Sequence, residues 1–236
     1  MQENSKAELV KRYVFFLLGL FVNSLGVACI TKANLGTSPI TSVPYVLSLA
    51  FRPTIGQFTI VWSLLLVAVQ ILLLRRSFQL INLLQIPVSI LFGFFIDFSM
   101  DVVLGWLAPG AYPAKLISLL IGCVVLGFGV FMEVAANVVM LPGEATSKAL
   151  TQITGREFGT VKICVDVTMC VTAVVISLIL LRSVQGVREG TVIAALLVGA
   201  ISKVFSRCLN ASVQKLFQPS AKYAAAGVMT EQISES

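Results

Sequence analysis

Apolar residues dominate six long stretches of the chain, with charged or turn-forming residues between them. Several stretches exceed the roughly 18 apolar residues that mark a membrane-spanning helix. Two shorter helical pieces each follow a proline, and a helix of that length would extend only about 20 Å, less than the ~30 Å hydrocarbon core. We therefore predict six spans and two re-entrant or broken helices. The predicted spans are 12–32, 56–75, 80–106, 114–135, 158–181 and 189–215, and the short helices are 39–51 and 142–154.

The first and second halves of the chain repeat each other. Residues 17–60 match 120–163 at a constant offset of 103, and a three-residue insertion then changes the offset to 106, which aligns Gly93 with Gly199. Three spans per repeat is an odd number, so the second repeat should enter the membrane inverted. Such paired repeats are typical of secondary transporters. The matched pairs at the first offset include Gly19 and Gly122, Gly26 and Gly129, Ala33 and Ala136, Asn34 and Asn137, Pro39 and Pro142, and Gly56 and Gly159.

We divide the chain accordingly. The predicted parts are a cytoplasmic N-terminal segment (1–11), membrane repeat 1 (12–107), an inter-repeat loop (108–113), membrane repeat 2 (114–217) and a polar, disordered tail (218–236). With the N-terminus inside, about twice as many basic residues fall toward the cytoplasm as toward the outside, which agrees with the positive-inside rule. We expect a multi-pass protein of a bacterial cell membrane.

Composition narrows the function classes. The chain is 57% hydrophobic and 12% charged, whereas about a quarter of the residues of a soluble domain are charged. The net charge of +6 does not indicate nucleic acid, because the basic residues stand singly at helix ends. Histidine is absent, and none of the five cysteines forms a CxxC pair, so a zinc site or a histidine-based catalytic set is not expected. We predict no enzyme activity, no cofactor and no metal.

Small residues recur every seven positions in both repeats, at Gly19, Gly26 and Ala33 and again from Gly122 to Ala136. Seven residues return to nearly the same helix face, so each set forms a smooth face that admits another backbone closely. Either static packing or sliding against a neighbouring helix would use such a face.

Each repeat is interrupted between its first span and its short helix. Ser38 precedes Pro39, as an N-cap precedes proline at the first helical position, and the freed N–H groups of such a helix start suit a carboxylate or other anion. Backbone interrupted at membrane depth must be satisfied by protein or ligand. The predicted substrate-binding residues are Asn34, Gly36, Thr37, Ser38, Asn137, Gly143, Glu144 and Thr146.

Ionisable residues inside spans are costly and usually paired or functional. Glu133 stands alone in an apolar run, and with Glu144 it is our candidate for proton or sodium coupling. Charges four residues apart predict the helix pairs Lys162–Asp166 and Glu144–Lys148. The candidate gate combines opposite charges at equivalent positions of the two repeats, namely Asp97 and Asp101 with Lys203 and Arg207.

The segment NLGTSP (34–39), together with LPGEA (141–145), resembles the YczE-type bacterial membrane proteins, which are distantly similar to the YitT group. The resemblance covers most of the chain and implies a bacterial polytopic membrane protein.

The first functional hypothesis is a secondary transporter of a small polar or anionic solute, bound near the bilayer midplane between the two interruptions. The alternative is a non-transporting membrane partner, such as a substrate-capture subunit of a larger complex. A channel is a further reading. The expected partners are the lipid bilayer and the solute, and the sequence is compatible with a homo-oligomer or a partner membrane protein.

Overall fold

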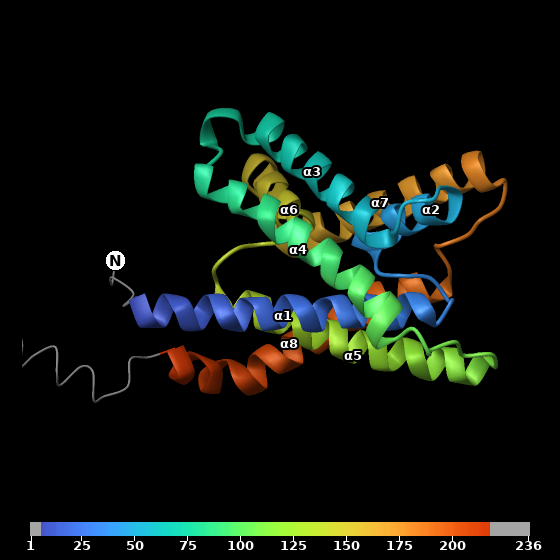
Figure 1. Cartoon of the computed structure of the whole chain (residues 1–236). Helices are drawn as coiled ribbons and strands as arrows, with labels where there is room; N and C mark the ends of the chain where they lie inside the picture. The colour runs from blue at the N-terminus through green and yellow to red at the C-terminus, as the bar shows by residue number, and fades with distance from the viewer. Residues whose placement is uncertain (1–5, 218–236) are drawn as a thin grey trace, which may run out of the picture.

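A computed structural model describes residues 6–217, and every regular element in that range is a helix (Figure 1). Short 3₁₀ turns at Pro39–Thr41, Arg75–Ser77 and Leu80–Leu84 and a π-helical turn at Ser99–Val103 join or extend the α-helices. The predicted tail lies outside the described residues. The α-helices are α1 (Lys6–Lys32), α2 (Ser42–Ala50), α3 (Ile55–Leu74), α4 (Gln85–Phe98), α5 (Tyr112–Ala136), α6 (Pro142–Thr154), α7 (Phe158–Leu181) and α8 (Glu189–Phe217).

Six helical segments are long and apolar enough to cross a membrane, which confirms the predicted number of spans. They are α1, α3, α5, α7, α8 and the continuous stretch Leu80–Val103 that contains α4. Helices α2 and α6 have nine and 13 residues and are too short to span. The chain is thus an integral, polytopic membrane protein.

Helices α1 and α5 form the centre of the molecule and run in opposite directions (Figure 1). Their glycines permit close backbone contact: a β-carbon added to Gly26 would lie 2.5 Å from the Cα of Leu126, and one added to Gly129 would lie 2.5 Å from the Asn23 nitrogen. The predicted small-residue faces therefore pack against each other.

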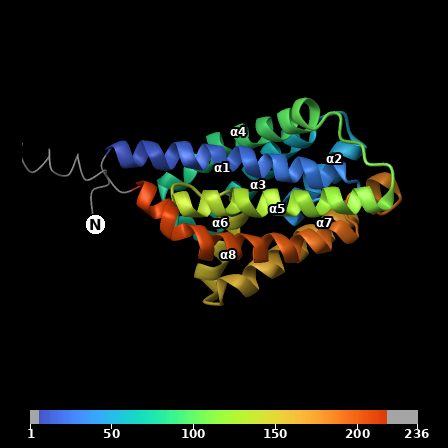
Figure 2. The same cartoon turned by 90° about the horizontal axis from the view of Figure 1, so that it is seen from below.

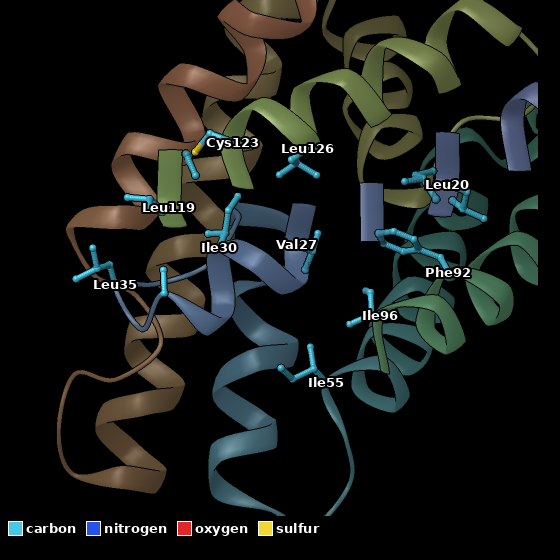
Figure 3. Packing of buried hydrophobic residues seen from close by; sticks show 13 residues of the cluster. Leu20, Val27, Ile30, Leu35, Ile55, Phe92, Ile96, Leu119, Cys123 and Leu126 are labelled. Atoms are coloured by element: carbon cyan, nitrogen blue, oxygen red, sulfur yellow. The ribbon is translucent and has the colours of Figure 1, made fainter. Parts of the chain in front are cut away.

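A hydrophobic core surrounds this crossing (Figure 3). Leu20, Val27 and Ile30 of α1 are buried with residues of α5 and α4, including Leu126 and Phe92. Many large apolar side chains on the outer helix faces are instead exposed, as expected where the surrounding solvent is lipid.

The remaining helices pack around the central pair in a reciprocal pattern. Helix α4 lies on α1, and α8 lies on α5 (Figure 2). Helix α3 contacts α6, and α7 contacts α2. Each short helix therefore packs against a long helix from the other half of the chain.

Two predicted elements differ from the structure. The segment 39–51 begins as a 3₁₀ turn before α2, because Pro44 has no N–H to donate to the Ile40 carbonyl, so a continuous α-helix from Pro39 would lack that bond. The predicted helix 80–106 ends at Val103, where the Leu104 N–H bonds back to the Ser99 carbonyl. The prediction 142–154 matches α6.

At the end of the bundle where α1 begins, Arg12 joins three helices. Its guanidinium pairs with Glu8 at 2.9 Å, donates to the Ala136 carbonyl at the end of α5 at 3.2 Å, and lies 4.6 Å from the Phe217 ring centroid of α8. A cation at a helix C-terminus and over an aromatic ring is stabilising on both counts.

We expect Arg12→Gln to destabilise the protein by about 2 kcal/mol, which lowers the melting temperature in detergent by roughly 4–8 °C. Lys11→Gln is the matched control, because the Lys11 amine makes one exposed bond, 3.3 Å to the Leu216 carbonyl. Equal melting temperatures for the two variants would show that the Arg12 contacts contribute nothing.

Candidate functional site

A polar cavity of about 350 Å³ opens at the end of the bundle where α1 begins. Its wall is made by the end of α3, the segment leading into α4, the end of α5 with the residues that follow it, and α6. The residues that line it include Gln70, Ser77, Gln79, Asn82, Gln85, Glu133, Asn137, Glu144, Lys148 and Gln152.

The two predicted coupling residues, Glu133 and Glu144, line this cavity together. Glu133 is 4% exposed, and its carboxylate accepts a hydrogen bond of 2.8 Å from the Asn23 side-chain amide. No ion pair reaches either carboxyl in the described part of the chain. An ionisable side chain inside a spanning helix is usually paired or functional, and here the Glu133 carboxylate is held by the Asn23 amide.

Glu144 is half-buried in the first turn of α6, where the helix dipole favours a carboxylate. Burial raises the pKa of this carboxyl, an effect opposed by Lys162 and reinforced by Asp166. The predicted pair Lys162–Asp166 forms at 2.6 Å. The predicted pair Glu144–Lys148 does not form, and the exposed Lys148 lies at the cavity wall.

An amide network fixes the closed side of the cavity. The side chains of Gln70 and Gln85 exchange hydrogen bonds of 3.2 and 3.3 Å. The Gln70 amide nitrogen also lies 3.1 Å from the Pro142 carbonyl and 3.2 Å from the Thr146 hydroxyl, so its two N–H groups are shared among three acceptors. Both glutamines are almost fully buried. Because these bonds satisfy buried polar groups, they hold the start of α6 against α3 and α4.

The predicted joint site between the two interruptions is not formed as expected. Asn137 and Glu144 line the cavity, but Asn34, Gly36, Thr37 and Ser38 do not. The buried Thr37 hydroxyl bonds the hydroxyls of Thr31 and Thr41 at 2.9 Å, at the opposite end of α1.

Apolar contact closes the space where that joint site was predicted. The Ile40 side chain packs on Gly143, where an added β-carbon would lie 3.0 Å from the Ile40 Cδ1. The Ser38 hydroxyl bonds the Thr41 hydroxyl at 2.7 Å and makes no helix cap. Thr146 faces Gln70, so the two helix starts offer no shared anion site.

The four gate candidates do not meet in this structure. The Asp97 carboxylate accepts the Gly56 N–H at 2.8 Å and the Thr54 hydroxyl at 2.6 Å, and so binds the start of α3. Asp101, Lys203 and Arg207 are exposed. Asp97 lies on α4 beside α1, and Arg207 lies on α8 beside α5, so the central pair separates them.

Because Asp97 binds the start of α3, we expect the double swap Asp97→Arg with Arg207→Asp to be no more stable than Asp97→Arg alone. Asp97→Ala should cost about 1–2 kcal/mol through the lost bonds, whereas Asp101→Ala should change little. Thermal unfolding of the five proteins, wild type included, measures this. If the double swap instead recovered the stability that Asp97→Arg loses, the predicted pair between Asp97 and Arg207 would be supported.

Sequence reasoning missed Asn23, Gln70 and Gln85. The available signal was a large amide inside an apolar run, which indicates an interhelical bond or a site. The described residues contain no group of three or more side chains that could hold a metal ion.

The comparisons with known proteins agree with a membrane protein. Residues 10–207 match a family model described as a family of unknown function, DUF6198. The chain belongs to this family. It is 30% identical over 223 residues to the uncharacterized membrane protein YczE of Bacillus subtilis (strain 168), covering 94% of this chain and 96% of that protein. It is 28% identical over 118 residues to the uncharacterized protein YyaS of the same organism, covering 50% and 57%. No solved structure matches the chain.

Proposed function

We propose that this protein is a secondary transporter of a small polar solute, which binds in the cavity beside Glu133 and Glu144. The observation that carries the proposal is a cavity with polar and two acidic side chains in its lining, at one end of a bundle of spanning helices. Polar groups at membrane depth that line a cavity are characteristic of a transport pathway.

We infer that the chain consists of two inverted repeats. In support, the corresponding helices α1 and α5 are antiparallel, and each is followed by an asparagine in the left-handed conformation, Asn34 (φ 55°) and Asn137 (φ 52°). The reciprocal contacts, α3 with α6 and α7 with α2, are those that a two-fold axis between the repeats would generate.

The two ends of the bundle differ in a way that suits alternating access. At one end, the Gly190 N–H donates to the Leu35 carbonyl at 2.8 Å, and the Thr37 N–H donates to the Thr191 hydroxyl at 3.2 Å. At the other end, the repeat offsets relate the pair Gly190 and Leu35 to Leu84 and Val138. They relate the pair Thr191 and Thr37 to Gln85 and Met140. Val138, Met140 and Gln85 line the cavity there, so that end is open. We propose that it faces the cytoplasm, as the basic residues predict.

The lining favours a neutral, zwitterionic or cationic solute. Amide groups recognise hydroxyls, amines and carbonyls equally well, and the two carboxyls oppose an anion. The start of α6 already carries Glu144 in its first turn. Lys148, at the rim, is the one basic side chain among the described residues that line the cavity. The anionic part of our sequence hypothesis is therefore not retained in this proposal.

The test is a thermal-shift screen of the purified chain against sugars, amino acids, organic cations and organic anions. A solute at 100 times its dissociation constant adds about 2.7 kcal/mol of stability. Solutes that stabilise the protein are then assayed for uptake into proteoliposomes. Saturable uptake supports a transporter. Binding without uptake supports the capture-subunit alternative, and flux that does not saturate supports a channel. If only anions bind, the solute class is wrong.

A further inference from the structure

In the first half of the chain, α4 docks on α3 through two glycines. A β-carbon added to Gly93 would lie 2.6 Å from the Gly56 carbonyl oxygen, so the two backbones touch. One turn further along α4, the Asp97 carboxylate binds the Gly56 N–H and the Thr54 hydroxyl. The contact therefore combines close packing with a polar latch.

The corresponding contact in the second half is absent from the described structure. The repeat offsets relate Gly56 to Gly159 and Gly93 to Gly199. An added β-carbon at Gly199 would meet nothing within 4 Å, and one at Gly159 would meet only the Glu157 carboxylate at 4.0 Å. Both glycines are exposed, and α8 packs on α5 (Figure 2). The second half is open where the first is closed.

The same offsets give the open contact its own latch. Thr54 corresponds to Glu157, and Asp97 corresponds to Lys203. In the closed half a hydroxyl donates to a carboxylate, whereas in the open half an ammonium could donate to a carboxylate. Both Glu157 and Lys203 are exposed, and neither forms an ion pair with another described residue. The acceptor lies on α4 in the closed half and beside α7 in the open half, so donor and acceptor have changed places, but each pair still joins a donor to a carboxylate.

We propose that the protein has a second state in which α8 docks on α7, with Gly199 against Gly159 and the Lys203 ammonium bound by the Glu157 carboxylate. In that state α4 releases α3, and the open end of the cavity closes. The inference rests on the inverted repeats of the proposed function, and it replaces Asp97 by Glu157 as the partner of Lys203. Alternating access needs one half to open as the other closes, and here α4 would leave α3 as α8 docks on α7.

Cross-linking in native membranes tests this state. In a chain whose five cysteines are replaced by alanine, Glu157→Cys and Lys203→Cys should form an intramolecular disulfide on oxidation with copper phenanthroline. The matched pair Thr54→Cys and Asp97→Cys joins residues whose side chains are 2.6 Å apart here and should cross-link in the present state. Mass spectrometry separates links within one chain from links between chains.

A third cysteine reports whether the cavity is open. Gln152→Cys, at the cavity wall, should react with an impermeant maleimide when the 54–97 link is closed, and at least tenfold more slowly when the 157–203 link is closed. The proposal is overturned if the 157–203 pair does not cross-link while 54–97 does, if it links only different chains, or if the labelling rate is unchanged.

A second variant avoids the double cysteines. A β-carbon added at Gly199 meets nothing within 4 Å in the present structure. Gly199→Leu would block docking on α7, so it should accelerate labelling of Gln152→Cys by holding the cavity open. Gly110→Leu, also in open space, is the control. Equal labelling rates in the two would overturn the inference. No solute enters these measurements: a protein that exchanges states but takes up nothing would refute transport and leave the exchange standing.

Discussion

Gly26→Leu should prevent the protein from folding into its membrane bundle. A β-carbon at this position would lie 2.5 Å from the Leu126 backbone nitrogen and Cα, and backbone cannot move aside as a flexible side chain can. Overpacking a well-packed core costs about 1–3 kcal/mol or more, and here the clash separates α1 from α5, which carry most of the core. We expect loss of the monodisperse species in detergent chromatography.

The control for Gly26 is Gly110→Leu, which adds the same side chain where nothing lies within 4 Å. It should give wild-type yield and melting temperature. Gly129→Leu should reproduce the Gly26→Leu result from the other helix, because its added β-carbon meets the Asn23 backbone. A folded Gly26→Leu protein with an unchanged melting temperature would mean that the α1–α5 crossing is looser than described.

The sequence was sufficient for the helices and for the helix faces that pack closely, but not for which two helices pack together. Apolar length gives the spans directly, and Gly, Asn and Pro at matched positions marked both interruptions, including the start of α6 at Pro142. The seven-residue glycine spacing also identified the faces that pack. Apolar length and glycine spacing are local signals that depend on neighbouring residues in the chain, whereas the interruptions were marked by the match between two distant segments.

The candidate site was predicted less well, because its contacts join segments far apart in the sequence. Nothing local indicates that Ile40 covers Gly143, or that Asp97 binds the backbone of Gly56 across 41 positions. We expected acidic side chains to pair with basic side chains. In the structure the Asp97 carboxylate instead accepts a backbone N–H from the first turn of a helix, which has no partner within that helix. Glu133 was recognisable because few explanations fit a carboxyl in an apolar run, and Glu144 because it follows the interruption at Pro142.

Glu144→Gln should abolish the dependence of uptake on a proton gradient while leaving the protein folded. Burial raises the pKa of Glu144, so in the wild type the folded state holds its proton to a higher pH than the unfolded chain does. The contribution of Glu144 to stability is therefore greatest below the usual carboxyl value of about 4.5 and is lost as pH rises through the raised pKa. A glutamine cannot ionise, so the variant should lose this part of the pH dependence and be more stable than wild type at neutral pH.

Two measurements decide the role of Glu144, and the first needs no solute. Melting temperature against pH should fall less steeply for Glu144→Gln than for the wild type or for Lys148→Gln, which removes a charge one turn further along the same helix. Uptake into proteoliposomes, of whichever solute stabilises the protein, should respond to an imposed pH gradient in the wild type and Lys148→Gln only. Unchanged coupling in Glu144→Gln would remove this carboxyl from the mechanism and leave Glu133, buried against Asn23, as the remaining acidic side chain of the cavity. Glu133→Gln would then be the variant in which coupling is lost, because a glutamine amide cannot release and rebind a proton as a carboxyl can.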